Sequence, residues 1–167
     1  GINGFDLQQM AFALDRATIA DWSMFGKGLI RGDALQNFVN QTVHNKPIEQ
    51  LPIPFACVAT RVDTGQPILF QRGNLGQAVR ASSSVPGIFQ PTLIGGVEYV
   101  DGGLTSRVPV TVARRMGADV VIAVDVSWRG SNEVDQADVP IRPDTPRTRS
   151  LDFSAKLESI AAGEAAG

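Results

Sequence analysis

The sequence of 167 residues lacks the features that define several protein classes. Its single cysteine, Cys57, excludes an internal disulfide and a metal site built from several cysteines. No apolar run reaches the 18 residues that a transmembrane helix needs, and the first residues show no signal-peptide pattern. No cluster of carboxylates and histidines predicts a metal site, because His44 is the only histidine.

The chain also lacks a strong excess of positive or negative charge. The chain has 15 basic and 17 acidic residues, a net charge of −2 and no basic block, so nucleic acid is not an expected partner. The hydrophobic fraction of 43% and the charged fraction of 19% are typical of a globular protein. The length suits a single domain over residues 1–167. Because the chain does not begin with methionine, we expect it to start within a longer protein.

What is present is an alternation of helix and strand patterns, which predicts the α/β class. Helices are expected at 4–18, 34–44, 75–83, 109–115 and 153–166, with Asp33, Asn74 and Asp152 as N-terminal caps of three of them. Strands are expected at 55–62, 67–71, 88–93, 97–100, 119–126 and 139–142. The branched apolar run at 119–126 is typical of a parallel strand covered on both faces, so we expect a mainly parallel central sheet with a local hairpin.

The residues Tyr99-Val100-Asp101-Gly102-Gly103 form the most informative motif. Two glycines after an acidic residue place a carboxylate on a tight turn that other backbone can approach closely. Spacing alone favours an ordinary turn residue, since Asp-Gly is common in hairpins. A catalytic carboxylate at Asp101 is the alternative interpretation.

Several segments together resemble the patatin-like phospholipase family. Residues 77–91, with the run Ser82-Ser83-Ser84 followed by Pro86-Gly87, resemble its helix-and-turn motif, and 99–103 resemble its Asp-Gly-Gly/Ala motif. The hairpin at 59–73 is also similar. The resemblance is strongest to bacterial members related to the neuropathy-target-esterase branch, and it extends from Gly4 to the last helix.

The resemblance implies a three-layer α/β/α sandwich, incomplete at its N-terminal side, of which this chain would be the C-terminal two-thirds. It implies a serine lipid acyl hydrolase that cleaves fatty-acyl esters or lysophospholipids through a Ser–Asp dyad, with Asp101 as the base. It further implies no cofactor, and a bacterial protein in the cytoplasm or peripherally on a membrane. The serine of such enzymes lies in a G-x-S-x-G turn between a strand and a helix.

The chain departs from the family pattern in ways that leave alternatives open. No serine has glycine two positions after it, and no triple-glycine loop is present, so the serine is expected outside this chain. Ser106-Arg107-Val108-Pro109 stands where Asn-x-Pro is common, and the segment between Trp128 and Ile141 is short. A non-catalytic scaffold or interaction module, and an acyltransferase, are therefore alternative functions. If the chain is complete, we expect an exposed sheet edge and self-association.

Other residues have simpler structural interpretations. We expect Ser82, Ser83 and Ser84 to form a helix end and a turn rather than a nucleophile. His44 is expected at a helix C-terminus, which accounts for it without a Ser-His-Asp triad. Cys57 is expected in the core.

Three further features of the sequence are candidates for a functional role. Gly95-Gly96 is expected to form a hairpin turn rather than an oxyanion loop, and Asp125 to cap a neighbouring loop. The segment 22–30 carries large apolar side chains between glycines, including Trp22 and Phe25. It is expected to pack on the core, or alternatively to line an acyl pocket or touch a membrane surface.

Overall fold

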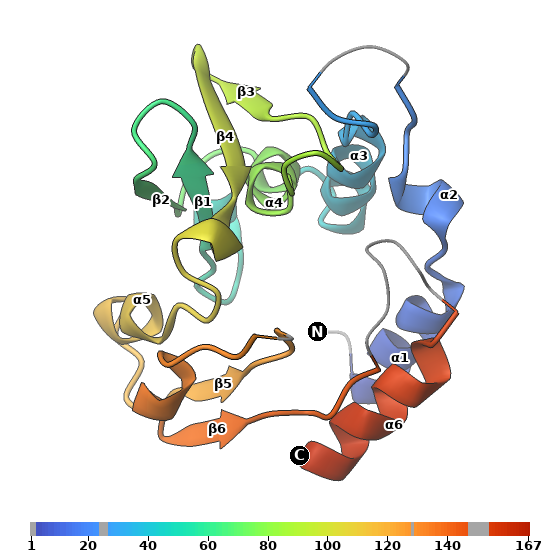
Figure 1. The fold of residues 1–167 in the computed structure, drawn as a ribbon, viewed down its shortest axis with the longest axis vertical. Coiled ribbons are helices and arrows are strands. Elements are labelled where there is room, and N and C mark those ends of the chain that lie inside the picture. Colours follow the sequence, from blue (N-terminus) through green and yellow to red (C-terminus); the bar gives the residue numbers. More distant parts are fainter. Residues whose placement is uncertain (1–2, 24–26, 128, 147–153) are drawn as a thin grey trace.

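A computed structural model describes residues 3–23, 27–127, 129–146 and 154–167, and the chain is a mixture of helices and strands (Figure 1). The α/β class expected from the sequence is therefore confirmed. The helices are α1 (Gly4–Ala13), α2 (Arg16–Ile19), α3 (Asp33–Thr42), α4 (Leu75–Ser82), α5 (Val110–Arg115) and α6 (Lys156–Ala166). The strands are β1 (Cys57–Arg61), β2 (Pro67–Phe70), β3 (Thr92–Ile94), β4 (Val97–Asp101), β5 (Ile122–Val124) and β6 (Val139–Ile141).

Four strands form one sheet in the order β2-β1-β4-β3, and every neighbouring pair in it is antiparallel. The expected mainly parallel central sheet is therefore not found in the described residues. For two of the three pairs, the reason is the length of the connections. Short turns join β1 to β2 and β3 to β4, and such turns allow only antiparallel pairing, whereas parallel neighbours need a long crossover. Among the strands of the described residues, β5 and β6 alone pair in parallel, as a separate two-stranded sheet.

Helix α4 lies between the four-stranded sheet and helix α3. It packs against β1 and β4, and α3 packs in turn against α4 (Figure 1). Asn74 caps α4 as expected, because its side chain accepts a hydrogen bond of 2.7 Å from the amide of Gln77. Ala78 and Ala81 of α4 are buried, and they contribute to the two clusters of apolar residues beneath the helix.

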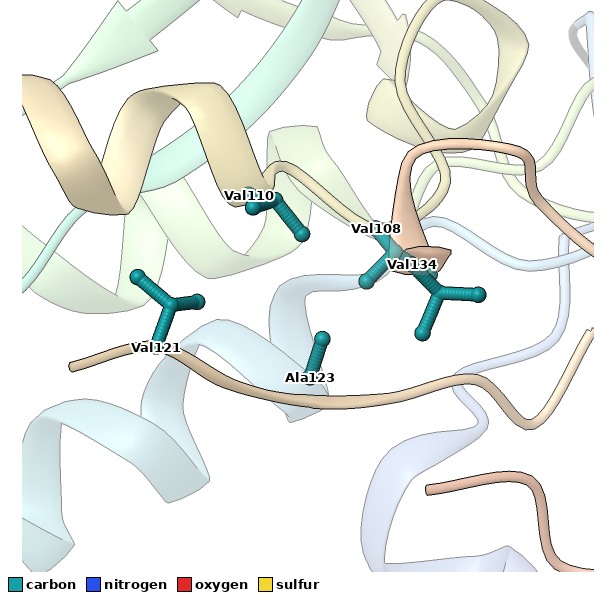
Figure 2. Packing of buried hydrophobic residues seen from close by; sticks show 5 residues of the cluster. All are labelled: Val108, Val110, Val121, Ala123 and Val134. Carbon is teal, nitrogen blue, oxygen red and sulfur yellow. The ribbon is translucent and has the colours of Figure 1, made fainter. Parts of the chain in front are cut away.

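The β5–β6 pair has one covered face and one exposed face. Figure 2 shows Val121 and Ala123 pointing from the β5 segment toward three valines of the α5 region and the following loop (Val108, Val110 and Val134). The alternate side chains are 51–66% exposed; they belong to Val120, Ile122, Val124 and Val126. The expectation that both faces are covered is therefore wrong for the described part of the chain, because α5 and the loop at Val134 lie on one side only.

Two helix boundaries differ from the sequence prediction for local reasons. The helix expected at 4–18 is broken at Asp15, whose carboxylate accepts hydrogen bonds from the amide and hydroxyl of Thr18 at 2.8 and 2.7 Å and so starts α2. Asp33 is the first residue of α3 rather than its cap. The carboxylate of Asp21 caps α3 instead, accepting hydrogen bonds from three successive amides that begin at Gly32.

The last helix begins later than expected, at Lys156, and the predicted cap Asp152 lies outside the described residues. Helices α1 and α6 lie side by side at one edge of the molecule (Figure 1). The ammonium group of Lys156 donates hydrogen bonds to the carbonyls of Phe12 and Leu14 at the end of α1. The two ends of the chain are thus joined by direct contacts.

Candidate functional site

Asp101 is the last residue of β4, and the chain turns immediately after it into one turn of 3-10 helix at Gly102–Leu104. The carboxylate accepts a hydrogen bond of 2.6 Å from the amide of Gly103, so the side chain caps the turn that follows it. Within the described part of the chain, no side-chain hydroxyl donates to this carboxylate. One carboxylate oxygen therefore remains for another donor.

Both glycines after Asp101 lie in close contacts, with strand backbone at Gly102 and with the Asp101 side chain at Gly103. A Cβ atom at Gly102 would lie 2.1 Å from the carbonyl oxygen of Val58, and one at Gly103 would lie 2.8 Å from Oδ1 of Asp101. Neither glycine has a positive φ, so it is the lack of space and not the backbone conformation that excludes a side chain. The predicted close approach of other backbone to this turn is confirmed, and the approaching backbone is strand β1.

Asp101 lines a cavity of about 420 Å³ between the start of β1 and the end of α4. Ser82, Ser83 and Arg107 also line it. Burial raises the pKa of the Asp101 carboxyl, and the hydrogen bond from Gly103 opposes that rise without cancelling it. A half-buried carboxyl with a raised pKa is a stronger proton acceptor than a solvated one, which suits it to act as a base.

A second, apolar hollow of about 410 Å³ adjoins this cavity. Phe55 and Pro109 line both spaces, and the hollow extends along α5, where Val112 and Met116 contribute to its wall. The site therefore combines one partly buried carboxylate with an adjacent apolar surface. This arrangement can accept an uncharged, largely apolar group beside a proton acceptor.

The three consecutive serines occupy different positions. Ser82 ends α4 and Ser83 follows it as the C-terminal cap, and both line the cavity that holds Asp101. Ser84 is fully buried, and its hydroxyl donates to the carbonyl of Arg80 at 2.8 Å. The interpretation of this run as a helix end and turn is confirmed for Ser83 and Ser84, and burial excludes Ser84 as a nucleophile.

His44 and Cys57 also follow their structural interpretations. His44 lies just after α3 in a left-handed conformation, with a φ of 53°, and its side chain is exposed. It does not line the cavity. Cys57 does line it, but it belongs to a buried apolar cluster, and burial raises the pKa of its thiol to about 11. The thiol is therefore protonated at neutral pH and is a poor nucleophile.

Two further candidates serve as turn and loop residues. Gly95 and Gly96 have φ values of 59° and 81° in the turn between β3 and β4, which confirms the hairpin interpretation. Asp125 is buried and accepts hydrogen bonds from the amide and hydroxyl of Ser127 and from the amide of Ser131, so it caps this loop as predicted. Burial acts to raise its pKa, but these hydrogen bonds outweigh burial and lower it.

The apolar segment at 22–30 is described only in part, because residues 24–26, including Phe25, lie outside the described residues. Ile30 is fully buried and pairs with Phe89, whereas Trp22 and Leu29 are each 56% exposed. No residue in the described part of this segment lines the Asp101 cavity. Packing on the core is thus confirmed for Ile30, and contact with a membrane stays a prediction.

No group of three or more potential metal ligands occurs in the described part of the chain. Across the ranges that the structure describes, every helix is too short or too polar to cross a bilayer.

Two hydrogen bonds to the Asp101 backbone were not predicted from the sequence. The hydroxyl of Thr60 donates to the carbonyl of Asp101 at 2.9 Å, and the carbonyl of Ser84 accepts the amide hydrogen of Asp101 at 3.0 Å. Thr60 precedes Asp101 by 41 positions, and the two residues meet only because β1 pairs with β4. The one sequence feature that could have drawn attention to Thr60 is its polar side chain within the apolar strand pattern at 55–62.

The chain belongs to the patatin-like phospholipase family, whose model matches residues 1–114. The match includes the serine run and the Asp101 motif, but it ends before β5. The family resemblance drawn from the sequence is confirmed, although the matched region stops short of the last helix. All residues that line the cavity around Asp101 lie within this matched region.

Similar proteins occur in mycobacteria and mammals. An uncharacterized NTE family protein of Mycobacterium bovis is 36% identical over 109 residues, which cover 65% of this chain and 30% of that protein. One of Mycobacterium tuberculosis is 35% identical over 108 residues, or 65% of this chain and 18% of that protein. Patatin-like phospholipase domain-containing protein 7 of Mus musculus is 30% identical over 119 residues, or 70% of this chain and 9% of that protein. The matched segment thus spans less than a third of each relative.

Proposed function

We propose that this chain carries the catalytic base of a serine lipid acyl hydrolase. Asp101 acts as the base of a Ser–Asp dyad, and the serine comes from sequence outside residues 1–167. The observation that supports this proposal is the placement of Asp101, on a glycine turn at a cavity wall, half-buried and with a raised pKa. Membership of the patatin-like phospholipase family supports a lipid substrate.

In the proposed reaction, the serine hydroxyl attacks the carbonyl carbon of an acyl ester while Asp101 accepts its proton. The tetrahedral intermediate collapses, the carbon–oxygen bond to the alcohol breaks, and the proton held by Asp101 passes to the leaving alkoxide. A water molecule then attacks the acyl-serine, with Asp101 again accepting a proton and returning it to the serine oxygen. The aspartate needs a pKa closer to neutrality than usual for this work, and burial acts in that direction.

The apolar hollow supports the choice of a fatty-acyl ester, including a lysophospholipid, as substrate. Its wall at Val112 and Met116 would bury an alkyl chain beside the carboxylate, and each methylene group buried contributes about 0.8 kcal/mol. The proposal places this chain as the C-terminal two-thirds of a patatin domain. In such a domain the remaining strands would complete a three-layer α/β/α sandwich.

The test uses the full-length polypeptide and p-nitrophenyl butyrate. Asp101→Asn should lower kcat/KM by about 10² to 10⁴, since that is the usual contribution of a general base. The matched control is Asp144→Asn, which alters an exposed carboxylate outside the cavity and should leave kcat/KM within about twofold. The 167-residue chain without the serine should show no turnover that a serine-reactive phosphonate abolishes.

Near-normal turnover by Asp101→Asn would remove Asp101 from the mechanism. An inactive wild-type polypeptide would favour the non-catalytic scaffold. Transfer of the acyl group to an added alcohol in preference to water would identify an acyltransferase.

A further inference from the structure

The backbone of Asp101 is held from two sides at the point where β4 ends. On one side, its amide donates to the carbonyl of Ser84 at 3.0 Å. On the other side, its carbonyl accepts the hydroxyl hydrogen of Thr60 at 2.9 Å. Both partners are buried, Thr60 being 4% exposed and Ser84 fully buried. The peptide groups on both sides of the Asp101 Cα atom are therefore restrained by hydrogen bonds to buried partners.

The hydroxyl of Thr60 also contacts a second hydroxyl. A threonine hydroxyl has one proton to donate, and Thr60 uses its proton on the Asp101 carbonyl. The hydroxyl of Thr105 donates to the carbonyl of Gly102 at 3.2 Å and lies 3.0 Å from the hydroxyl of Thr60, so it can donate to Thr60 only by sharing its proton between these two acceptors. Thr60 thus lies between the Asp101 carbonyl and a hydroxyl of the turn that follows Asp101.

The hydroxyl of Ser84 also contacts a threonine hydroxyl. Its proton goes to the carbonyl of Arg80 at 2.8 Å, so Thr92 is the donor in the 3.0 Å contact between the hydroxyls of Ser84 and Thr92. Thr92 is 1% exposed, and a buried polar group left without a partner costs about 1–3 kcal/mol. The Ser84 side chain therefore fixes the peptide whose carbonyl receives the Asp101 amide.

We propose that Thr60 and Ser84 are positioning residues for the Asp101 carboxylate. By holding the carbonyl and the amide of Asp101, they keep the turn in the geometry that lets Oδ1 accept from Gly103 and leaves the other oxygen free on the cavity wall. Neither residue touches the reacting atoms. The importance of this positioning for catalysis rests on the proposed function of Asp101, but the restraint itself can be measured without any activity.

The experiment follows amide hydrogen exchange by NMR in the full-length polypeptide. Thr60→Val keeps the shape of the side chain and removes the hydroxyl. The amide of Gly103, which is bonded to Asp101, should exchange about fivefold faster, because a typical hydrogen bond contributes about 1 kcal/mol. The amide of Gly76 is the internal control, since it is likewise bonded to a side-chain oxygen, that of Asn40 at 2.9 Å, and its exchange should not change.

Two further variants make the test specific. Thr60→Ser retains the hydroxyl and should restore slow exchange at Gly103. Thr42→Val removes a hydroxyl-to-carbonyl bond of the same 2.9 Å length in α3, and it should affect neither amide. Ser84→Ala provides a second variant with the same expected acceleration at Gly103, and it decides the question if Thr60→Val does not fold.

Unchanged exchange at Gly103 in the folded variants would overturn the proposal. Equal acceleration at Gly103 and Gly76 would also overturn it, because that result shows a general loss of stability. Since no substrate is involved, an inactive full-length enzyme would contradict the proposed function and leave the outcome of this test unaffected.

Discussion

Gly102→Ala should destabilise the fold although it adds a single methyl group. Gly102 is buried where the turn after Asp101 crosses β1. The new Cβ would lie 2.1 Å from the carbonyl oxygen of Val58 and 2.6 Å from its carbonyl carbon. Backbone atoms of a paired strand cannot rotate away as the end of a side chain can. The turn and β1 must therefore separate.

The size of the effect follows from that geometry. Bringing the methyl group to a tolerable 3.0 Å from the Val58 oxygen requires a displacement of roughly 1 Å. Forcing extra carbon into a packed interior typically costs 1–3 kcal/mol, and a rigid obstacle places Gly102→Ala at about 3 kcal/mol. In a domain of this size, each kcal/mol lowers the melting temperature by roughly 2–4 °C, so the expected decrease is about 6–12 °C.

Urea unfolding at pH 7, followed by circular dichroism, measures the difference in the free energy of unfolding. Gly163→Ala is the matched control, because Gly163 lies within α6 and a Cβ there meets nothing within 4 Å. It should raise the free energy of unfolding by up to about 1 kcal/mol through helix propensity. If Gly102→Ala costs less than about 0.5 kcal/mol, the close contact with β1 does not restrict this position and the reasoning fails.

Two further predictions concern pH. Burial raises the folded-state pKa of Asp101, so ionisation of this carboxyl destabilises the fold above its unfolded pKa of about 3.9. Asp101→Asn should therefore increase the free energy of unfolding at pH 7 with no gain near pH 3, and urea titrations showing a loss at pH 7 would contradict this. Hydrogen bonds from Ser127 and Ser131 lower the folded-state pKa of Asp125, so its contribution is present above about pH 3.9 and is lost as pH falls through the folded pKa. Asp125→Asn should cost about 1–3 kcal/mol at pH 7 and progressively less toward pH 2 in melting experiments, and a cost independent of pH would refute the assignment.

Local features of the fold could be predicted because they depend on neighbouring residues. The cap at Asn74, the glycine turn between β3 and β4 and the loop cap at Asp125 all act over a few positions. The strand direction in the main sheet could not be predicted in the same way. An apolar run such as 55–62 predicts a strand, but it does not show which strands become its neighbours.

In the candidate site too, local motifs could be predicted and contacts between distant segments could not. Asp101 and its glycines were recognised from a short motif, and the structure places them on a cavity. Thr60 was not recognised, because its contact with Asp101 depends on the register of β1 with β4, which brings Ala59 opposite Asp101. The cap of α3 was missed for a similar reason. Asp21 reaches the amide of Gly32 from 11 positions earlier, and no pattern of that length precedes a helix regularly.

The exposed face of the β5 segment has a consequence for how the protein behaves in a crowded solution. Residues 120–124 are entirely apolar and rich in β-branched side chains, a composition that favours intermolecular β-structure. Asp119 and Asp125 flank this run. Stacking copies of the segment would bring like carboxylates together at both ends, so we expect these residues to act as gatekeepers against aggregation. Asp125 thereby combines two roles, because the carboxylate that orders its own loop also makes cross-β assembly unfavourable.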